Sequence, residues 1–187
     1  MHDLAPLYPL GGYSPQIDIY DRITLTENAD FAYASVAAHA NCSGKLNDIA
    51  LETIGVALPS TGQMTSNDSI TAIWTGSDQW MIEAPIHSHE TMATHLSIKL
   101  AGIAAVTEQN DSFVHFDLVG EVYIDVLERS CAVNSRQMPH NAVIRTTIEH
   151  ISCFILHRST GHVSILGARS SAKSLHHNLT NSIRSVI

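Results

Sequence analysis

The stretch from Ile70 to Pro85 constrains the fold more than any other part of the sequence, because it holds two alternating runs separated by turn-forming residues. Apolar side chains recur at every second position before Gly76 and again after Gln79, which is the period of a half-buried strand. Glycine, serine and aspartate, which lie between the two runs, favour turns. The stretch therefore predicts a β-hairpin.

The side-chain faces decide the register of this hairpin. A loop of four residues would place an apolar side chain opposite Glu83, whereas a five-residue loop, Thr75 to Gln79, makes every opposed pair apolar. Directly opposed residues share a face, so only the longer loop gathers the apolar set on one side of the sheet. We interpret the resulting tryptophan pair as core packing rather than as a ligand platform. The predicted pairs are Trp74 with Trp80, Ala72 with Ile82, and Ile70 with Ala84.

The first half of the chain predicts a β-α-β-β-α-β unit over residues 31–108, the order of the ferredoxin-like fold. Both expected helices have apolar residues at helical spacing, a serine at the N-cap and a glycine at the end. In chain order, the segments are a strand at 31–38, a helix from Ser43 to Gly55, the hairpin, a helix from Ser88 to Gly102 and a strand at 103–107.

Residues 109–187 predict a second α+β lobe of similar order, with mostly antiparallel strands. Residues 1–30 predict an arm rich in proline and tyrosine, followed by a first pair of strands. The arm either covers the protein's own core or contacts a partner. No linker rich in proline, glycine or serine separates the lobes, so we expect one compact body. The elements of the second lobe are strands at 113–118, 143–148, 153–157 and 163–166, a short helix opened by Gly120, and a final helix at 168–183.

Charge and composition argue against several classes of protein. The chain of 187 residues has 18 acidic and 10 basic residues, a net charge of -8, which does not suit a nucleic-acid backbone. The longest apolar run is far shorter than the ~20 residues of a membrane span, and Met1–Pro6 show no signal-peptide pattern. Three widely spaced cysteines, Cys42, Cys131 and Cys153, fit a reducing compartment. We expect a cytoplasmic protein without nucleic-acid or membrane partners.

Several patterns approach functional motifs without completing them. Gly167–Ser174 resembles a phosphate-binding loop, but Ala172 replaces the second glycine that the motif requires. His89 and His95 are six positions apart and would point about 120° apart on a helix, so they do not match a zinc motif. Cys131 follows the end of a helix, where the helix dipole does not assist a thiolate. We therefore predict no catalytic, cofactor-binding or metal-binding residue in this chain.

Four stretches together resemble the gamma subunit of heterotetrameric sarcosine oxidase. The tryptophan hairpin is the most distinctive, and the others consist mainly of apolar spacing. They are Trp74-x-Gly-Ser-Asp-Gln-Trp80-Met-Ile-x-Ala-Pro85, Leu10-Gly-Gly-Tyr-Ser-Pro15, the strand and helix from Phe116 to Cys131, and the final strand, turn and helix from Leu156 through Ser170.

This resemblance implies a non-catalytic subunit of a complex that oxidatively demethylates sarcosine or a related N-methyl amine. It further implies that the complex uses FAD, FMN and NAD and passes the one-carbon unit to tetrahydrofolate. The flavins and folate would lie on larger subunits and a zinc on the smallest, so that the partners are the alpha, beta and delta subunits. The resemblance also implies the fold of the folate-dependent aminomethyltransferases, without their catalytic residues.

Two other readings remain open at the level of sequence. One is a free-standing, folate-binding one-carbon transfer protein of the aminomethyltransferase fold, and the other is a homo-oligomeric binding domain. No acidic residue is obviously placed to receive a pterin. Asp117, which lies close before Gly120, is the candidate to examine in the structure.

Overall fold

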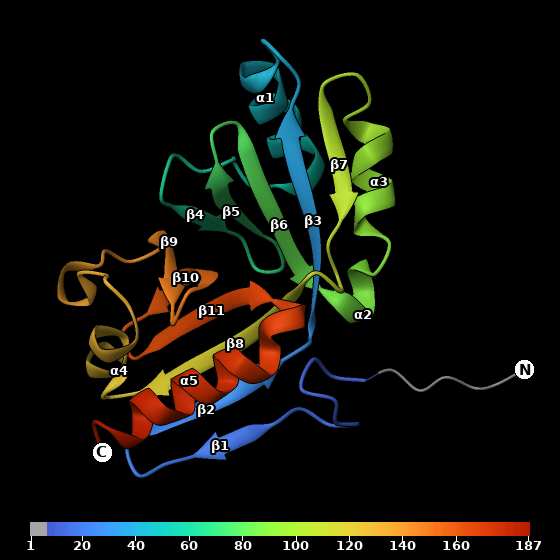
Figure 1. Ribbon diagram of the computed structural model, residues 1–187. Helices are drawn as coiled ribbons and strands as arrows, with labels where there is room; N and C mark the ends of the chain where they lie inside the picture. The colour runs from blue at the N-terminus through green and yellow to red at the C-terminus, as the bar shows by residue number, and fades with distance from the viewer. Residues whose placement is uncertain (1–6) are drawn as a thin grey trace, which may run out of the picture. The chain divides into compact units, whose positions relative to one another are not determined.

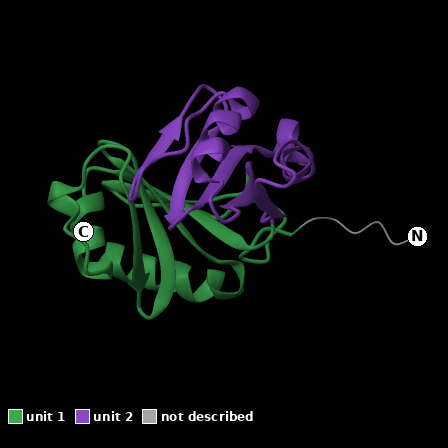
Figure 2. Cartoon of the chain, turned by 90° about the horizontal axis from the view of Figure 1, so that it is seen from above, with its two compact units in different colours: residues 1–29, 111–187 green, residues 30–110 purple. Residues whose placement is uncertain are grey.

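A computed structural model describes residues 7–187. Met1–Pro6, which begin the predicted arm and were compared with a signal peptide, lie outside the described part. The chain divides into two compact units (Figure 2). One unit comprises residues 30–110, and the other combines residues 7–29 with residues 111–187. Each contains an antiparallel sheet and helices, which confirms the predicted α+β class.

The unit of residues 30–110 contains the predicted β-α-β-β-α-β order with one additional edge strand, β4 (Figure 1). Its sheet has the order β4-β5-β6-β3-β7, and all neighbouring strands are antiparallel. Helices α1 and α3 contribute to the core on the sheet face that carries Ala34, Ala72 and Ile82. The elements are β3 (Phe31–Ala38), α1 (Ser43–Ile54), β4 (Met64–Ser66), β5 (Thr71–Gly76), β6 (Gln79–Pro85), α2 (Ile86–His89), α3 (Met92–Lys99) and β7 (Ala104–Glu108).

The hairpin of β5 and β6 has the predicted register, with Trp74 opposite Trp80. Its turn is tighter than predicted, because the strands continue to Gly76 and from Gln79, and a bulge after Trp74 absorbs the additional residue. The predicted pair of Ile70 with Ala84 continues this register but lies one residue outside the ladder, since β5 begins at Thr71. The apolar pairs nearer the sheet centre are buried, whereas both tryptophans are half-buried.

The N-cap residues of two helices differ from the prediction. The N-cap of α1 is Cys42, and Ser43 is the first helical residue; its hydroxyl donates instead to Asp78 Oδ1 at 2.7 Å. Ser88 lies inside the short helix α2, and α3 begins only after Thr91. A serine can bond to other acceptors than the first helical turn, so its presence alone does not define a cap. The predicted end of α1 at Gly55 is confirmed, with a left-handed backbone at φ 71°.

The second unit contains a six-stranded sheet of order β1-β2-β8-β11-β10-β9. The N-terminal strands belong to this sheet, since β2 pairs antiparallel with β8. Helices α4 and α5 supply residues to one core with one face of the sheet. Figure 1 shows α5 lying along the strands. The elements are β1 (Ile17–Ile19), β2 (Ile23–Asn28), β8 (Phe113–Gly120), α4 (Tyr123–Ser130), β9 (Val143–Ile148), β10 (Ile151–Ser159), β11 (His162–Ala168) and α5 (Ala172–Arg184).

Gly120 has a different position from the predicted one. It is the last residue of β8 and not the opening of a helix, since α4 starts at Tyr123. Its φ is 152°, and a Cβ atom at this position would overlap the backbone of Arg22 and Ile23. Glycine is therefore required here because β8 and the start of β2 approach closely.

Candidate functional site

A polar network lies on the face of the six-stranded sheet opposite the one that joins α4 and α5. The residues of β8 alternate between the two faces. Val114, Phe116 and Leu118 belong to the helix-covered core, so His115 and Asp117 occupy the other face. Asp117 is the centre of the network.

Four side chains donate hydrogen bonds to the Asp117 carboxylate. An ionised carboxylate only accepts, so each histidine donates from the Nε2–H that faces it. Three donors converge on Oδ1 and one binds Oδ2, and they come from β2, β8 and β11. The donors are Ser164 Oγ at 2.6 Å, His162 Nε2 at 2.9 Å and His115 Nε2 at 3.0 Å to Oδ1, and Asn28 Nδ2 at 2.8 Å to Oδ2.

The donors keep Asp117 ionised. Burial alone raises the pKa of its carboxyl, but the hydrogen bonds from His115, His162 and Ser164 and the charge of His115 outweigh burial and hold the pKa well below its usual range. Arg158 Nε donates to Ser164 Oγ at 3.0 Å, which extends the network to β10. The result is a fixed negative charge among donors from four strands.

The same geometry determines what Asp117 can do chemically. A carboxylate offers about four acceptor sites, two on each oxygen, so the three donors to Oδ1 fill that oxygen and Asn28 takes one of the two sites on Oδ2. A general base needs a pKa close to the working pH, and a pterin would need the carboxylate oxygens as acceptors. With its pKa held well below the usual range and Oδ1 fully engaged, Asp117 is a poor general base and offers a pterin few acceptor sites, and its arrangement is that of a cross-strand anchor.

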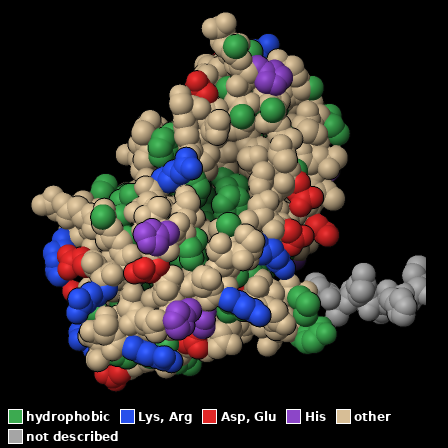
Figure 3. All heavy atoms as spheres, in the orientation of Figure 1, with side chains coloured by type: hydrophobic (Ala, Val, Ile, Leu, Met, Phe, Trp, Pro, Cys, Tyr) green, Lys and Arg blue, Asp and Glu red, His purple; other side chains and the backbone are tan. Residues whose placement is uncertain are grey.

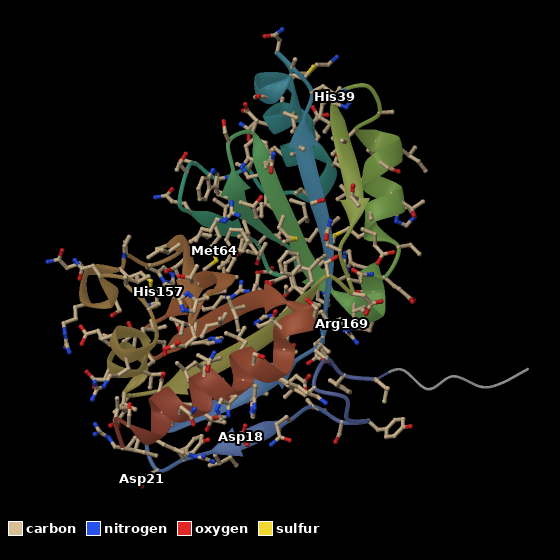
Figure 4. All side chains as sticks on the ribbon, viewed as in Figure 1. Asp18, Asp21, His39, Met64, His157 and Arg169 are labelled. Carbon is tan, nitrogen blue, oxygen red and sulfur yellow. The ribbon has the colours of Figure 1, made fainter. Side chains whose placement is uncertain are left out.

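Side chains fill the space around the stretch that resembles a phosphate-binding loop. Ala172, which replaces the motif's glycine, is buried in the core, and a Cβ on Gly167 would overlap the side chain of Leu175. Arg169 donates to the carbonyl of Leu7 at 2.8 Å and pairs with Asp111 at 3.2 Å. Figure 4 shows Arg169 where β11 passes into α5. The stretch thus joins β11 of the sheet to the last helix, α5.

The histidine and cysteine candidates are dispersed. His89 ends α2 whereas His95 lies in α3, and His176 Nε2 contacts Asp18 Oδ2 at 2.6 Å. Cys131 directly follows α4, as predicted, and burial raises the pKa of its thiol. Across residues 7–187, no three or more His, Cys, Asp or Glu side chains are grouped so as to hold a metal ion.

The hollows within the two units differ in size and lining. In the six-stranded unit, a shallow and open hollow of about 430 Å³ has a polar lining from α5, Arg129 and Glu149. In the other unit, an apolar gap of about 10 Å³ lies between α1, α3 and the sheet, too small for any organic ligand.

No helix in the described part has the length and apolar character needed to cross a membrane. On the face of the molecule that Figure 3 shows, basic and acidic side chains are interspersed.

Comparison with known proteins gives structural matches only. No family model matches the sequence, and no curated protein matches it. A chain of heterotetrameric sarcosine oxidase from Corynebacterium sp. U-96, in complex with pyrrole 2-carboxylate, superposes with a TM-score of 0.78 at 20% identity, over 87% of this chain and 84% of that chain. Aminomethyltransferase T of the glycine cleavage system from Bartonella henselae gives a TM-score of 0.66 at 14% identity.

These matches confirm the predicted resemblance at the level of fold. The aminomethyltransferase match covers 84% of this chain but 45% of the other, so this chain spans less than half the length of that enzyme. The sarcosine oxidase match is nearly complete in both directions. The chain therefore has the fold of a whole sarcosine oxidase chain and of part of an aminomethyltransferase.

Proposed function

We propose that this chain is a non-catalytic subunit of a multisubunit flavoenzyme of the sarcosine oxidase type. The observation that carries the proposal is the two-way coverage of 87% and 84% with a chain of a heterotetrameric enzyme. A match of this kind fits a subunit of similar extent, whereas the aminomethyltransferase match fits one portion of a larger enzyme.

The chemistry of the chain supports a non-catalytic role. Its most strongly perturbed carboxylate, Asp117, is engaged by four internal donors. The chain in this proposal acts by completing the assembly. FAD, FMN, NAD, tetrahydrofolate and zinc belong to the partner subunits, and the reaction is the oxidative demethylation of sarcosine or a related N-methyl amine in the cytoplasm.

Affinity purification from the native organism tests this proposal. A tag added to the chromosomal copy of the gene should recover larger subunits together with the visible absorption of oxidised flavin. The complex should consume sarcosine or another N-methyl amine. Recovery of the chain alone, without flavin-bearing partners at several salt concentrations, would contradict the proposal. Neighbouring genes for a large flavin- and NAD-binding subunit and a mid-sized FAD subunit would support it independently.

The second candidate is a free-standing, folate-binding one-carbon transfer protein, which the aminomethyltransferase match favours. Because internal donors already engage both oxygens of Asp117, we expect the isolated chain to give no heat of binding when titrated with tetrahydrofolate. Micromolar binding that Asp117→Ala abolishes would favour this second candidate. The matched control is Asp125→Ala, since Asp125 is an exposed partner of Arg136 on the helix side of the same unit.

A further inference from the structure

The N-terminal arm carries an unusual concentration of exposed apolar side chains. Of the eight large hydrophobic residues that are exposed in the described part, four lie between positions 7 and 19. The two isoleucines of β1 are 53% and 79% exposed, and Tyr13 is 79% exposed. In Figure 3, hydrophobic side chains gather where the described chain begins. We call Leu7, Tyr13, Ile17 and Ile19 the arm edge.

The backbone of β1 is open along the same edge. β1 is the outermost strand and pairs only with β2 in the sheet. The backbone groups of Gln16 and Tyr20 form hydrogen bonds with β2. Because bonding alternates along an antiparallel strand, the backbone N–H and C=O groups of Ile17 and Ile19 point away from β2. Ile17 and Ile19 therefore direct their backbone N–H and C=O groups to the outer edge, and their exposed apolar side chains stand beside it on one face of the sheet.

Three sets of side-chain contacts hold the arm in this conformation. The buried Glu27 carboxylate accepts the backbone N–H groups of Leu10 at 2.8 Å and of Gln16 at 3.0 Å, which fixes both ends of the loop that carries Tyr13. His176 contacts Asp18, and Arg169 binds the Leu7 carbonyl. Figure 4 labels Asp18 below α5. An edge that is ordered before binding loses little conformational freedom when a partner docks.

Sheet edges that avoid pairing are usually protected by charged side chains. β9, the opposite edge of this sheet, follows that rule with the exposed Arg145. In residues 13–19 the one charged side chain is Asp18, which is already paired with His176. β1 is thus an edge strand whose one charge is engaged by α5 and whose two isoleucines are exposed, so it retains its capacity for pairing.

We propose that the arm edge docks an extended, apolar segment of a partner subunit, which adds to the sheet as a strand beside β1; this inference rests on the proposed function. Its small area argues against a second copy as the occupant. A stable interface buries about 800 Å² per partner, whereas even one aromatic side chain contributes only ~150–250 Å². A strand of three residues and two flanking side chains is too small for a self-contained dimer, but it suits one contact within a larger assembly.

Matched isoleucine variants test this inference. Ile19→Lys places a charge on the edge, and Ile98→Lys places the same charge on α3 at a similar exposure of 69%. Both variants should keep the thermal midpoint of the wild type, because both side chains are exposed. In the tagged complex from the native organism, Ile19→Lys should lower the recovered flavin per chain by about tenfold or more, and Ile98→Lys should leave it within about twofold.

Hydrogen exchange of the backbone provides the second measurement. Docking of a strand should slow exchange of the Ile17 and Ile19 amides in the complex relative to the isolated chain, because those amides then donate to the partner. Equal flavin recovery for both lysine variants with unchanged exchange would overturn the docking site and leave the proposed function intact. Absence of flavin-bearing partners in the wild type would overturn both. A homodimer that Ile19→Lys dissociates would contradict the choice of occupant.

Discussion

At the scale of single residues, the Asp117 network shows how a charged group is tolerated inside a sheet. An unpaired carboxylate at this level of burial would be costly, but four donors compensate the loss of hydration. The donors come from residues as distant as Asn28 and Ser164. Removing the carboxylate would take this acceptor from all four donors at once, of which His115 and Ser164 are buried.

Asp117→Asn should destabilise the protein by roughly 2–4 kcal/mol at neutral pH, because the amide nitrogen cannot accept the bonds that the carboxylate accepts. Urea unfolding measures this loss. Asp125→Asn is the matched control, since Asp125 is half exposed in its pair with Arg136 and should cost at most about 1 kcal/mol. Equal effects of the two substitutions would show that the Asp117 bonds contribute little.

The network also predicts a dependence of stability on acid. The folded pKa of Asp117 is depressed, so its contribution is complete above the unfolded pKa near 3.9 and is lost as the pH falls toward the folded pKa. Below about pH 4 this one group should lower the free energy of unfolding by up to about 1.4 kcal/mol per pH unit. Urea titrations between about pH 6 and 2 should give a shallower loss of stability in acid for Asp117→Asn than for the wild type. Parallel curves would contradict the assigned pKa shift.

At the scale of elements, the tryptophan hairpin shows what residue patterns can and cannot predict. Alternation and the sharing of faces predicted the opposition of Trp74 and Trp80 correctly. The bulge that shortens the turn was not predicted, because one additional residue in a strand changes local geometry without changing the overall alternation. The N-cap assignments of Ser43 and Ser88 were wrong because the competing partners of a hydroxyl become known only in three dimensions.

The two tryptophans should differ in their contribution to stability. Trp80 packs against the core cluster, and its Nε1–H donates to the Pro59 carbonyl at 3.0 Å. Trp80→Phe removes this donor from a largely buried carbonyl and should cost about 1–2 kcal/mol. Trp74→Phe is the matched control, since Trp74 makes no such bond in residues 7–187 and should lose less than about 0.5 kcal/mol. Thermal unfolding with equal losses for both variants would contradict this assignment.

At the scale of the whole molecule, the order of elements was predictable, but the membership of the sheets was only partly so. Periodicity located nearly every strand and helix, because each has a regular apolar face. The pairing of β2 with β8 joins segments about ninety residues apart, and no local pattern reports such a contact. For the same reason, Asp117 could be singled out from the sequence, whereas its donors Asn28, His162 and Ser164 could not.

The central claim is that this chain functions as a subunit, and its state in unfractionated extract of the native organism tests that claim most directly. Gel filtration of the extract, with the chain detected by antibody and flavin by absorption, separates the alternatives without a tag. We predict that the chain, of 20.3 kDa, elutes with flavin-bearing protein at a mass several times its own. Elution of the chain at its own mass, or as a homo-oligomer free of flavoprotein, would contradict the claim.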